Sequence, residues 1–251
     1  MVTDGQVRIE PLGSGRRILV SRSHGFGTDA FLLASFASPS PRENAVDLGT
    51  GCGIIPTLWL GAKTVRTALG IEISAEACEL AQRTIDTNGD GVRFEVLNMD
   101  MRQLEGSDVE REHFDLVCCN PPYFVENSGY VSPDPERARA RADADCTLED
   151  VCAAARYLLR WGGRLCMCCR PERLCDLFCA MRASGIEPKK LRLCQQRPEK
   201  APWLALVEGR RGGKPTLDIL PPLLMLDEKG ESSAEVEAIY GCYREGRRSD
   251  K

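Results

Sequence analysis

A short apolar strand leads directly into three alternating glycines at Asn44-Ala45-Val46-Asp47-Leu48-Gly49-Thr50-Gly51-Cys52-Gly53. The run 44–48 has the length and composition of a buried strand, and the pattern of residues 51–61 is that of a helix. Glycines at such a turn let the backbone approach a ligand closely and direct the start of the helix toward it. The stretch therefore predicts a strand, a ligand-binding turn and a helix, in that order.

The alternation of strand and helix continues along the chain. Ser74 is expected to cap one helix, and Thr147 with Asp150 is expected to form a capping box on another. The further strands are expected at 67–71, 92–96, 114–119 and 164–169, and the further helices at 75–87, 148–161 and 172–183. Strands that alternate with helices are typical of a parallel, doubly wound sheet.

The last two predicted strands, 190–195 and 203–208, are connected differently. Only Gln196 to Pro202 joins them, and this connection has no helical pattern. A parallel crossover needs about a dozen residues or more, so the two strands are expected to form an antiparallel hairpin.

Composition and charge place the chain in a broad class. It has 251 residues, of which 43% are hydrophobic and 28% charged, as in an ordinary soluble domain. No apolar stretch approaches the ~20 residues of a membrane helix, and the first residues lack the apolar core of a signal peptide. We therefore expect a cytoplasmic protein that does not interact with membranes.

Thirteen cysteines are present, an odd number. Two pairs, Cys118-Cys119 and Cys168-Cys169, are adjacent, and neighbours in a strand point to opposite faces. This arrangement suits a reduced protein that uses cysteine as a small apolar residue. The cysteines between residues 166 and 179 lack a second cluster at ligand spacing and a nearby histidine, so we expect no metal site.

Acidic residues lie at the carboxyl ends of three successive predicted strands. Asp47 precedes the glycines at the end of the first strand, Glu72 ends the second, and Asp100 follows the third. The carboxyl ends of parallel strands form the edge where open α/β sheets bind ligands. Glu72 at this edge can accept both hydroxyls of a ribose. Asp100 has two alternatives of equal weight, a contact with the adenine amino group of a cofactor and the cap of a helix. S-adenosylmethionine carries an ammonium and a sulfonium but no phosphate, so acids beside Gly49, Gly51 and Gly53 suit it better than a diphosphate.

The fourth predicted strand ends in Asn120-Pro121-Pro122-Tyr123. The prolines fix the backbone and remove two donors. The side-chain carbonyl of Asn120 and the main-chain carbonyl of Pro121 can then accept both hydrogens of an NH2 group, and Tyr123 offers a flat face for a planar base. Two such acceptors localise the nitrogen lone pair, which can attack a sulfonium methyl group. The motif predicts methyl transfer to an exocyclic or amide nitrogen, with Asn120, Pro121, Pro122 and Tyr123 as the catalytic residues.

Several segments together resemble one enzyme family, the bacterial tRNA1(Val) (adenine(37)-N6)-methyltransferases, which modify the adenine 3′ of the anticodon. The resemblance spans residues 20–241 and rests on the glycine turn, the Asn-Pro-Pro-Tyr motif and three flanking stretches. These stretches are Gly25-Phe26-Gly27-Thr28-Asp29-Ala30-Phe31-Leu32-Leu33-Ala34, Leu206-Val207-Glu208-Gly209-Arg210-Arg211-Gly212-Gly213-Lys214-Pro215 and Leu220-Pro221-Pro222-Leu223. One departure is Ala140-Arg141-Ala142-Asp143, where the family often has Ala-Arg-His-Glu.

The resemblance implies a class I methyltransferase (Rossmann-like) fold, an α/β architecture with a seven-stranded, mostly parallel, doubly wound sheet and an antiparallel terminal hairpin. It implies S-adenosyl-L-methionine as cofactor and tRNA as partner. It also implies three parts: a segment 1–40 that covers the cofactor, a methyltransferase domain at 41–211, and a tail at 212–251 packed on the domain or extending it. The cofactor-binding residues expected from the motifs and the resemblance are Thr28, Asp29, Asp47, Gly49, Gly51, Gly53, Glu72, Asp100 and Asn120.

Charge is distributed unevenly. Residues 1–155 contain 14 Lys and Arg against 24 Asp and Glu, and residues 156–251 contain 19 against 13. A basic region on an acidic protein is either a solvated surface or a footprint for a polyanion. Two basic clusters are candidate RNA contacts, one after the catalytic motif and one expected in a glycine-rich loop. They consist of Arg137, Arg139 and Arg141, and of Arg210, Arg211 and Lys214.

Three other methyltransferase activities use similar chemistry. A glutamine methyltransferase that acts on release factors resembles this chain in its core but has a helical domain ahead of it, and 46 residues before Asp47 are too few for one. A DNA adenine methyltransferase needs a further domain to read the major groove. Methylation of ribosomal RNA remains open, as does a non-catalytic RNA-binding module, against which the intact Asn-Pro-Pro-Tyr motif argues.

Overall fold

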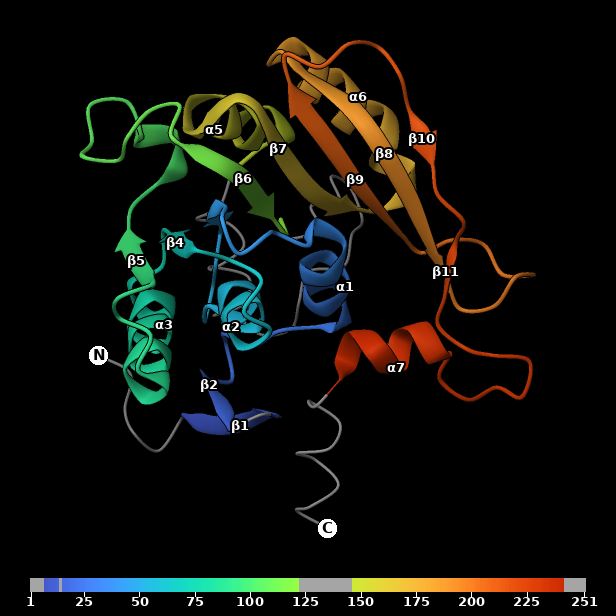
Figure 1. Cartoon of the computed structure of the whole chain (residues 1–251), viewed down its shortest axis with the longest axis horizontal. Helices are drawn as coiled ribbons and strands as arrows, with labels where there is room; N and C mark the ends of the chain where they lie inside the picture. The colour runs from blue at the N-terminus through green and yellow to red at the C-terminus, as the bar shows by residue number, and fades with distance from the viewer. Residues whose placement is uncertain (1–6, 14, 122–145, 242–251) are drawn as a thin grey trace.

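The computed structural model describes residues 7–13, 15–121 and 146–241. A twisted central sheet runs through this part of the chain, with its long strands in the order β5-β4-β3-β6-β7-β9-β8 (Figure 1). The strands are β3 (Asn44–Leu48), β4 (Thr67–Glu72), β5 (Phe94–Asn98), β6 (Phe114–Cys119), β7 (Leu159–Cys169), β8 (Ile186–Gln195) and β9 (Leu204–Arg211). Two short strands, β10 (Asp218–Ile219) and β11 (Leu223–Leu224), pair with the outer edge of β8.

The strand directions are those of the predicted fold. The pairs β3·β4, β4·β5, β3·β6 and β6·β7 are parallel, whereas β9 is antiparallel to both β7 and β8. The predicted hairpin is therefore confirmed, and with it the class I methyltransferase architecture of seven long strands with one reversed strand.

Helices cover both faces of the sheet. Figure 1 shows α5 (Leu148–Leu158) and α6 (Leu174–Ala183) on one side of the sheet and α2 (Ile54–Gly61), α3 (Ala75–Asn88) and α7 (Ala234–Tyr240) on the other. Side chains alternate along β3, so that Ala45 packs on the side of α2 and α3 while Val46 packs on the side of α5 and α6. Each face buries its own apolar cluster, which is the arrangement of a doubly wound sheet.

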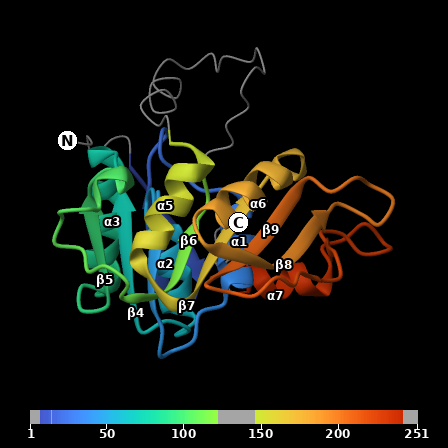
Figure 2. The ribbon, with the colours of Figure 1, turned by 90° about the horizontal axis from the view of Figure 1, so that it is seen from above.

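An N-terminal β-hairpin precedes this core and was not predicted from the sequence. Its strands are β1 (Arg8–Gly13) and β2 (Arg16–Val20), and α1 (Thr28–Ala37) follows before β3. Leu19 on β2 donates its backbone N–H to Thr84 of α3 at 3.0 Å, which fixes the hairpin against that helix. Figure 2, turned by 90°, shows α5 and α6 close to the viewer's side of the sheet and β8 and β9 at the end opposite α3.

The predicted helix caps are confirmed. The side chain of Ser74 accepts the backbone N–H of Ala77, and Gly89 ends α3 in the left-handed region at φ 69°. Thr147 and Asp150 form a reciprocal capping box at the start of α5. These local hydrogen bonds replace the partners that the first turn of a helix lacks.

Some predicted boundaries are wrong. The helix expected to continue to residue 161, just before the glycines at 162 and 163, is shorter. α5 stops at Leu158, and β7 begins at Leu159. Leu159 is fully buried and pairs with Phe114, after which β7 bulges until Arg164 pairs with Leu116. Gly162 supplies the left-handed φ of 78° that this bulge requires. Smaller differences are that β5 spans 94–98, and that α6 starts at 174 after a 3-10 turn.

The cysteines that the structure describes are free thiols, and most of them are buried in the sheet and its helices. Burial raises the pKa of Cys166 to about 12, which keeps this thiol protonated and unreactive at neutral pH. No helix within the described ranges is both long and apolar enough to span a membrane.

Candidate active site

The carboxyl ends of four parallel strands meet at one edge of the sheet, which we call the catalytic edge. Leu48 at the end of β3 is in register with Ile71 on β4 and with Cys119 on β6. Glu72 is in register with Asn98 at the end of β5. The residues that follow these strands therefore lie side by side: the glycine turn at 49–53, Glu72, Asp100 and Asn120.

The backbone of the glycine turn is left-handed at all three glycines. Gly49, Gly51 and Gly53 adopt left-handed φ values of 69°, 56° and 83°, which cost a residue with a Cβ atom about 1–2 kcal/mol each. A Cβ at Gly53 would also come within 3.1 Å of the Phe94 ring. The turn is held to the sheet by the Gly49 N–H, which donates to the Ile71 carbonyl at 2.8 Å.

Asp47 lies beneath this turn and is 2% exposed. Its Oδ2 accepts the Thr50 hydroxyl at 2.8 Å, whereas its Oδ1 has no hydrogen-bond partner among the described residues. Burial raises the pKa of Asp47 to about 7, and the nearby Glu72 carboxylate adds to the rise while the Thr50 hydrogen bond opposes it. A buried carboxylate with one open oxygen is a site for a cation or a donor group.

Gly70 is a site residue that the sequence analysis did not identify. It is in register with Asp47 on the neighbouring strand. A Cβ at Gly70 would lie 2.7 Å from Cγ2 of Thr50, so only glycine lets Thr50 fold back over β4 toward Asp47. An isolated glycine inside a strand often marks such a close approach, and that signal was available in the sequence.

Glu72 connects the glycine turn to the start of α3. Its Oε2 accepts the Gly51 N–H at 2.9 Å, and its Oε1 accepts the Ser74 N–H at 2.9 Å. Each carboxylate oxygen retains a free lone pair for a further donor. Asn98 supports the same segment, because its Nδ2 donates to the Glu72 and Ile73 carbonyls at 3.0 and 2.9 Å.

Asp100 forms a local ion pair. Its side chain caps the short 3-10 turn at 101–103 by accepting the backbone N–H of Arg102. The Arg102 guanidinium also donates to both oxygens, at 2.6 to 3.0 Å, and these hydrogen bonds hold the pKa of Asp100 below its usual value. The capping alternative is therefore observed, and Asp100 also lies at the catalytic edge.

Asn120 and Pro121 follow β6 directly, and both are half-buried. The Asn120 Oδ1 lies 2.9 Å from the Cys168 thiol, which donates to it from the neighbouring strand β7. Pro122 and Tyr123 lie outside the described residues. The described half of the motif contains two acceptors, the amide carbonyl of Asn120 and the main-chain carbonyl of Pro121, and it follows the strand next to the one that leads into the glycine turn.

Thr28 and Asp29 start α1, immediately after the segment 21–27. This segment packs on the start of α3, where Ser23 donates to Glu76 at 3.2 Å. The Thr28 hydroxyl accepts the Tyr240 hydroxyl at 2.9 Å, and Asp29 accepts the N–H of Ala30. The segment 21–27 therefore contacts the helix that follows Glu72.

The second basic cluster lies elsewhere. Arg210 and Arg211 belong to β9 and not to a loop, and Arg210 is in register with Arg164 on β7. Because Arg164 precedes Cys168 by four residues at ~3.3 Å each, Arg210 lies about 13 Å from the level of Asn120, toward the opposite edge of the sheet. Arg211 is 3% exposed, and its guanidinium pairs with Glu112 and with the Leu159 carbonyl. The loop assignment is therefore wrong for Arg210 and Arg211.

Lys214 is exposed and follows β9 at the same distal edge. Arg137, Arg139 and Arg141 lie outside the described residues.

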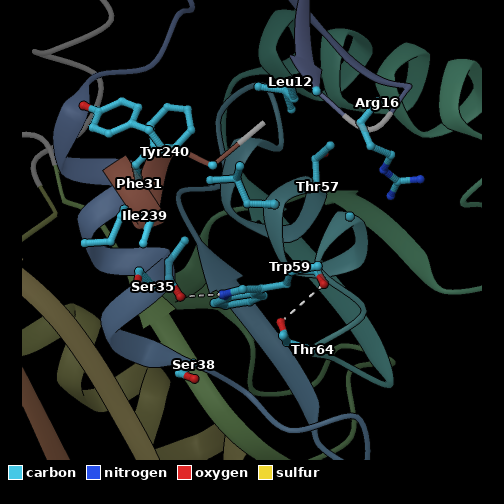
Figure 3. A pocket seen from close by; sticks show the side chains of 17 residues that line it. Leu12, Arg16, Phe31, Ser35, Ser38, Thr57, Trp59, Thr64, Ile239 and Tyr240 are labelled. Atoms are coloured by element: carbon cyan, nitrogen blue, oxygen red, sulfur yellow. Dashed lines mark hydrogen bonds between the residues drawn. The ribbon is translucent and has the colours of Figure 1, made fainter. Parts of the chain in front are cut away.

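A pocket of about 360 Å³ lies away from the catalytic edge, between the N-terminal hairpin, α1, α2 and the end of α7 (Figure 3). Aromatic side chains line it, among them Phe31, Trp59 and Tyr240. Figure 3 shows the Trp59 indole, whose N–H donates to the Ala34 carbonyl at 3.0 Å. None of the glycine-turn residues, Glu72 or Asn120 lines this pocket.

The strand order, the glycine turn and the acidic residues at successive strand ends define a class of enzyme, the S-adenosylmethionine-dependent methyltransferases. The chain belongs to the methyltransferase small domain family, whose model matches residues 24–174. The match includes the stretch 25–34, the glycine turn and the Asn120 motif, and it confirms both the enzyme class and the expected cofactor.

The sequence is similar to proteins named tRNA1(Val) (adenine(37)-N6)-methyltransferase. The Porphyromonas gingivalis protein is 30% identical over 73% of this chain and 73% of its own length. The Parabacteroides distasonis protein is 28% identical over 72% and 75%, and the Tolumonas auensis protein is 29% identical over 87% and 81%. The resemblance found in the sequence is therefore confirmed over most of the chain.

Solved structures support the fold. A predicted O-methyltransferase of Agrobacterium tumefaciens superposes with a TM-score of 0.68 at 24% identity, covering 87% of this chain and 96% of the other. A geranyl diphosphate C-methyltransferase of Streptomyces coelicolor gives a TM-score of 0.52 at 13% identity, over 72% and 80%. At these identities the likeness establishes the architecture.

Proposed function

We propose that this enzyme transfers a methyl group to the exocyclic N6 nitrogen of an adenine in tRNA, the adenine 3′ of the anticodon of tRNA1(Val). One observation carries the chemistry: Asn120 and Pro121 follow β6 at the point where β3 opens into the glycine turn. The amine acceptors and the proposed cofactor turn are thus on neighbouring strands. The substrate follows from the similarity to relatives that bear this name.

The proposed mechanism uses acceptors and no general base. The Asn120 Oδ1 and the Pro121 carbonyl accept the two amine hydrogens and draw the nitrogen lone pair out of conjugation with the ring. S-adenosylmethionine supplies an electrophilic methyl group when it is bound. With the amine so held, its nitrogen would take up this methyl group, leaving the cofactor as the neutral thioether, and the nitrogen would release a proton to solvent. Tyr123 would stack on the base, and Pro122 would fix the turn between them.

The proposed cofactor site is built around two acids. The Asp47 Oδ1 is buried without a partner among the described residues, which fits the ammonium of S-adenosylmethionine. The open lone pairs of Glu72 fit the ribose hydroxyls, and Asp100 fits the adenine amine at the neighbouring strand end. The backbone of Gly49, Gly51 and Gly53 would line the site, and the segment before residue 40, with Thr28 and Asp29, would cover it.

The elevated pKa of Asp47 makes cofactor binding pH-dependent. A cationic ligand favours the carboxylate, so affinity should increase as pH rises through about 7, where Asp47 ionises in the free protein. Between pH 6 and 7.5, S-adenosylhomocysteine should bind roughly five- to tenfold more tightly at the higher pH. Calorimetry at these two values measures the change while the amine of the ligand stays protonated.

The Asp47→Asn variant is the matched control, because asparagine has a similar shape and does not titrate. Its affinity should be weak and nearly independent of pH. An equally steep pH dependence in Asp47→Asn would assign the titration to another group and remove Asp47 from the site.

The substrate class can be tested with the intact enzyme and a labelled methyl donor. The assay combines the purified enzyme with S-adenosylmethionine that carries a tritiated methyl group. The acceptors are RNA, DNA and protein fractions from cells that lack the gene. Label in the tRNA fraction supports the proposal. Label in ribosomal RNA, DNA or a release factor would instead select one of the competing substrates. A tRNA substrate would place the reaction in the cytoplasm.

Arginines that follow the catalytic motif are the proposed RNA contacts. Replacing Arg137, Arg139 and Arg141 together with alanine should weaken tRNA binding at least tenfold and reduce its salt dependence, because each phosphate contact releases counterions. The paired replacement of Arg210 and Lys214, which belong to the distal edge, should change binding less than threefold. Filter binding at several salt concentrations compares the two sets, and the reverse ranking would place the RNA on the distal edge.

A further inference from the structure

The Asn120 side chain has a partner on the next strand whose role is not part of the chemistry described above. Cys168 lies on β7 and is fully buried. Its Sγ is 2.9 Å from the Asn120 Oδ1, although the two residues are 48 positions apart. Pairing on both sides fixes its backbone, since Met167 is in register with Cys119 and Cys168 with Leu206.

We propose that Cys168 is a positioning residue, whose thiol orients the Asn120 amide toward the target amine. The inference rests on the proposed function of Asn120. An amide oxygen has two lone pairs, so a thiol that occupies one leaves the other for a substrate hydrogen. Without this contact, the Asn120 amide is free to rotate about its terminal torsion, which has a broad energy minimum.

The choice of a thiol is consistent with this role. A thiol is a weak hydrogen-bond donor, so it orients the amide while withdrawing little electron density from Oδ1. That oxygen must remain a good acceptor, because it has to draw the hydrogen of the target amine out of the plane of the base. The contact also comes from the rigid centre of the sheet, where a small change in position is resisted by strands on both sides.

The chain offers a matched control on the same strand. Cys166 precedes Cys168 by two residues, so both side chains point to the same face of β7, and both are fully buried in the same apolar cluster. Cys166 has the same side chain as Cys168, but it lies two residues farther along β7 from the catalytic edge. Cys168→Val and Cys166→Val therefore change packing similarly and differ in the contact with Asn120.

The test is steady-state methylation of tRNA by these two variants, with thermal unfolding measured for both. Cys168→Val should lower kcat about tenfold, the loss expected for one orienting hydrogen bond, and leave the KM for S-adenosylmethionine and for tRNA within about twofold. Cys166→Val should keep kcat within about twofold of the wild type. Cys168→Ser, which restores a donor, should recover kcat to within about threefold, which no merely structural role predicts.

A double-mutant cycle separates this inference from the proposed function. In an Asn120→Ala background, Cys168→Val should cause no further loss, because its effect acts through the amide. If Asn120→Ala is inactive but Cys168→Val and Cys166→Val behave alike, the positioning role is wrong and the function stands. If Asn120→Ala keeps wild-type kcat, the proposed function itself fails. Should Cys168→Val unfold, Cys168→Ala and Cys168→Ser give the same comparison.

Discussion

Replacing Asn120 with alanine should lower kcat for tRNA methylation by about two orders of magnitude. The amide oxygen at the end of β6 is proposed to bind the amine most strongly in the transition state, when the nitrogen lone pair leaves conjugation. An interaction of that kind raises kcat and contributes little to the binding of either substrate. The KM for tRNA and the KM for S-adenosylmethionine should therefore stay within about threefold of the wild type.

Two measurements make this prediction specific. Calorimetry with S-adenosylhomocysteine should show nearly unchanged affinity in the Asn120→Ala variant, because Asp47 and Glu72 remain in place. Asn120→Asp tests the acceptor itself, since it keeps the oxygen and adds a charge beside the cofactor site. An Asn120→Ala enzyme with more than about a tenth of wild-type kcat would contradict the role of Asn120.

Replacing one functional group of the substrate should reduce methylation even more. A valine tRNA transcript in which the adenine 3′ of the anticodon is replaced with guanine should accept no methyl group above background. Guanine presents a carbonyl oxygen where adenine presents its N6 amine. The two acceptors proposed for the amine, on Asn120 and Pro121, would then face an acceptor, and no hydrogen bond could form.

The control for this transcript changes a neighbouring adenine of the same loop or stem, which leaves the target amine intact. Methylation of that control should remain within about threefold of the unmodified transcript, since phosphate contacts do not depend on the base. Equal methylation of the guanine-substituted transcript would show that the enzyme modifies another position.

The fold was largely predictable because its signals are local. The alternating pattern from residue 44 gave the parallel sheet, and the short connection from Gln196 to Pro202 gave the antiparallel hairpin, since chain geometry forbids a parallel crossover of that length. Ser74 and the Thr147–Asp150 pair gave the helix starts, because capping is a contact between residues three apart.

Long-range contacts were not predictable from one sequence. The composition around Arg211 is typical of a loop, but a carboxylate 99 residues away, on Glu112, holds this side chain in the interior. The contact between Cys168 and Asn120 joins different strands in the same way. Glycines at 162 and 163 resemble a helix end, whereas they allow a bulge that depends on pairing with β6.

Local patterns also identified the strand ends but not the state of their side chains. Asp47, Glu72 and Asp100 all lie at the carboxyl ends of neighbouring strands as predicted, yet each has a different environment. Asp47 is buried with an elevated pKa, Glu72 is hydrogen-bonded to the glycine turn, and Asp100 is paired with Arg102. Burial and partners depend on the neighbouring strands, so they become visible only in the folded chain.

The central claim is that this enzyme makes N6-methyladenine in a valine tRNA. Its most direct test is nucleoside mass spectrometry of valine tRNA purified from cells that lack the gene, and from the same cells supplied with the wild-type gene or with Asn120→Ala. We expect N6-methyladenine to be absent from the deletion strain, restored by the wild type, and nearly absent with Asn120→Ala. Persistence of N6-methyladenine in valine tRNA of the deletion strain, or its loss from ribosomal RNA instead, would contradict the claim.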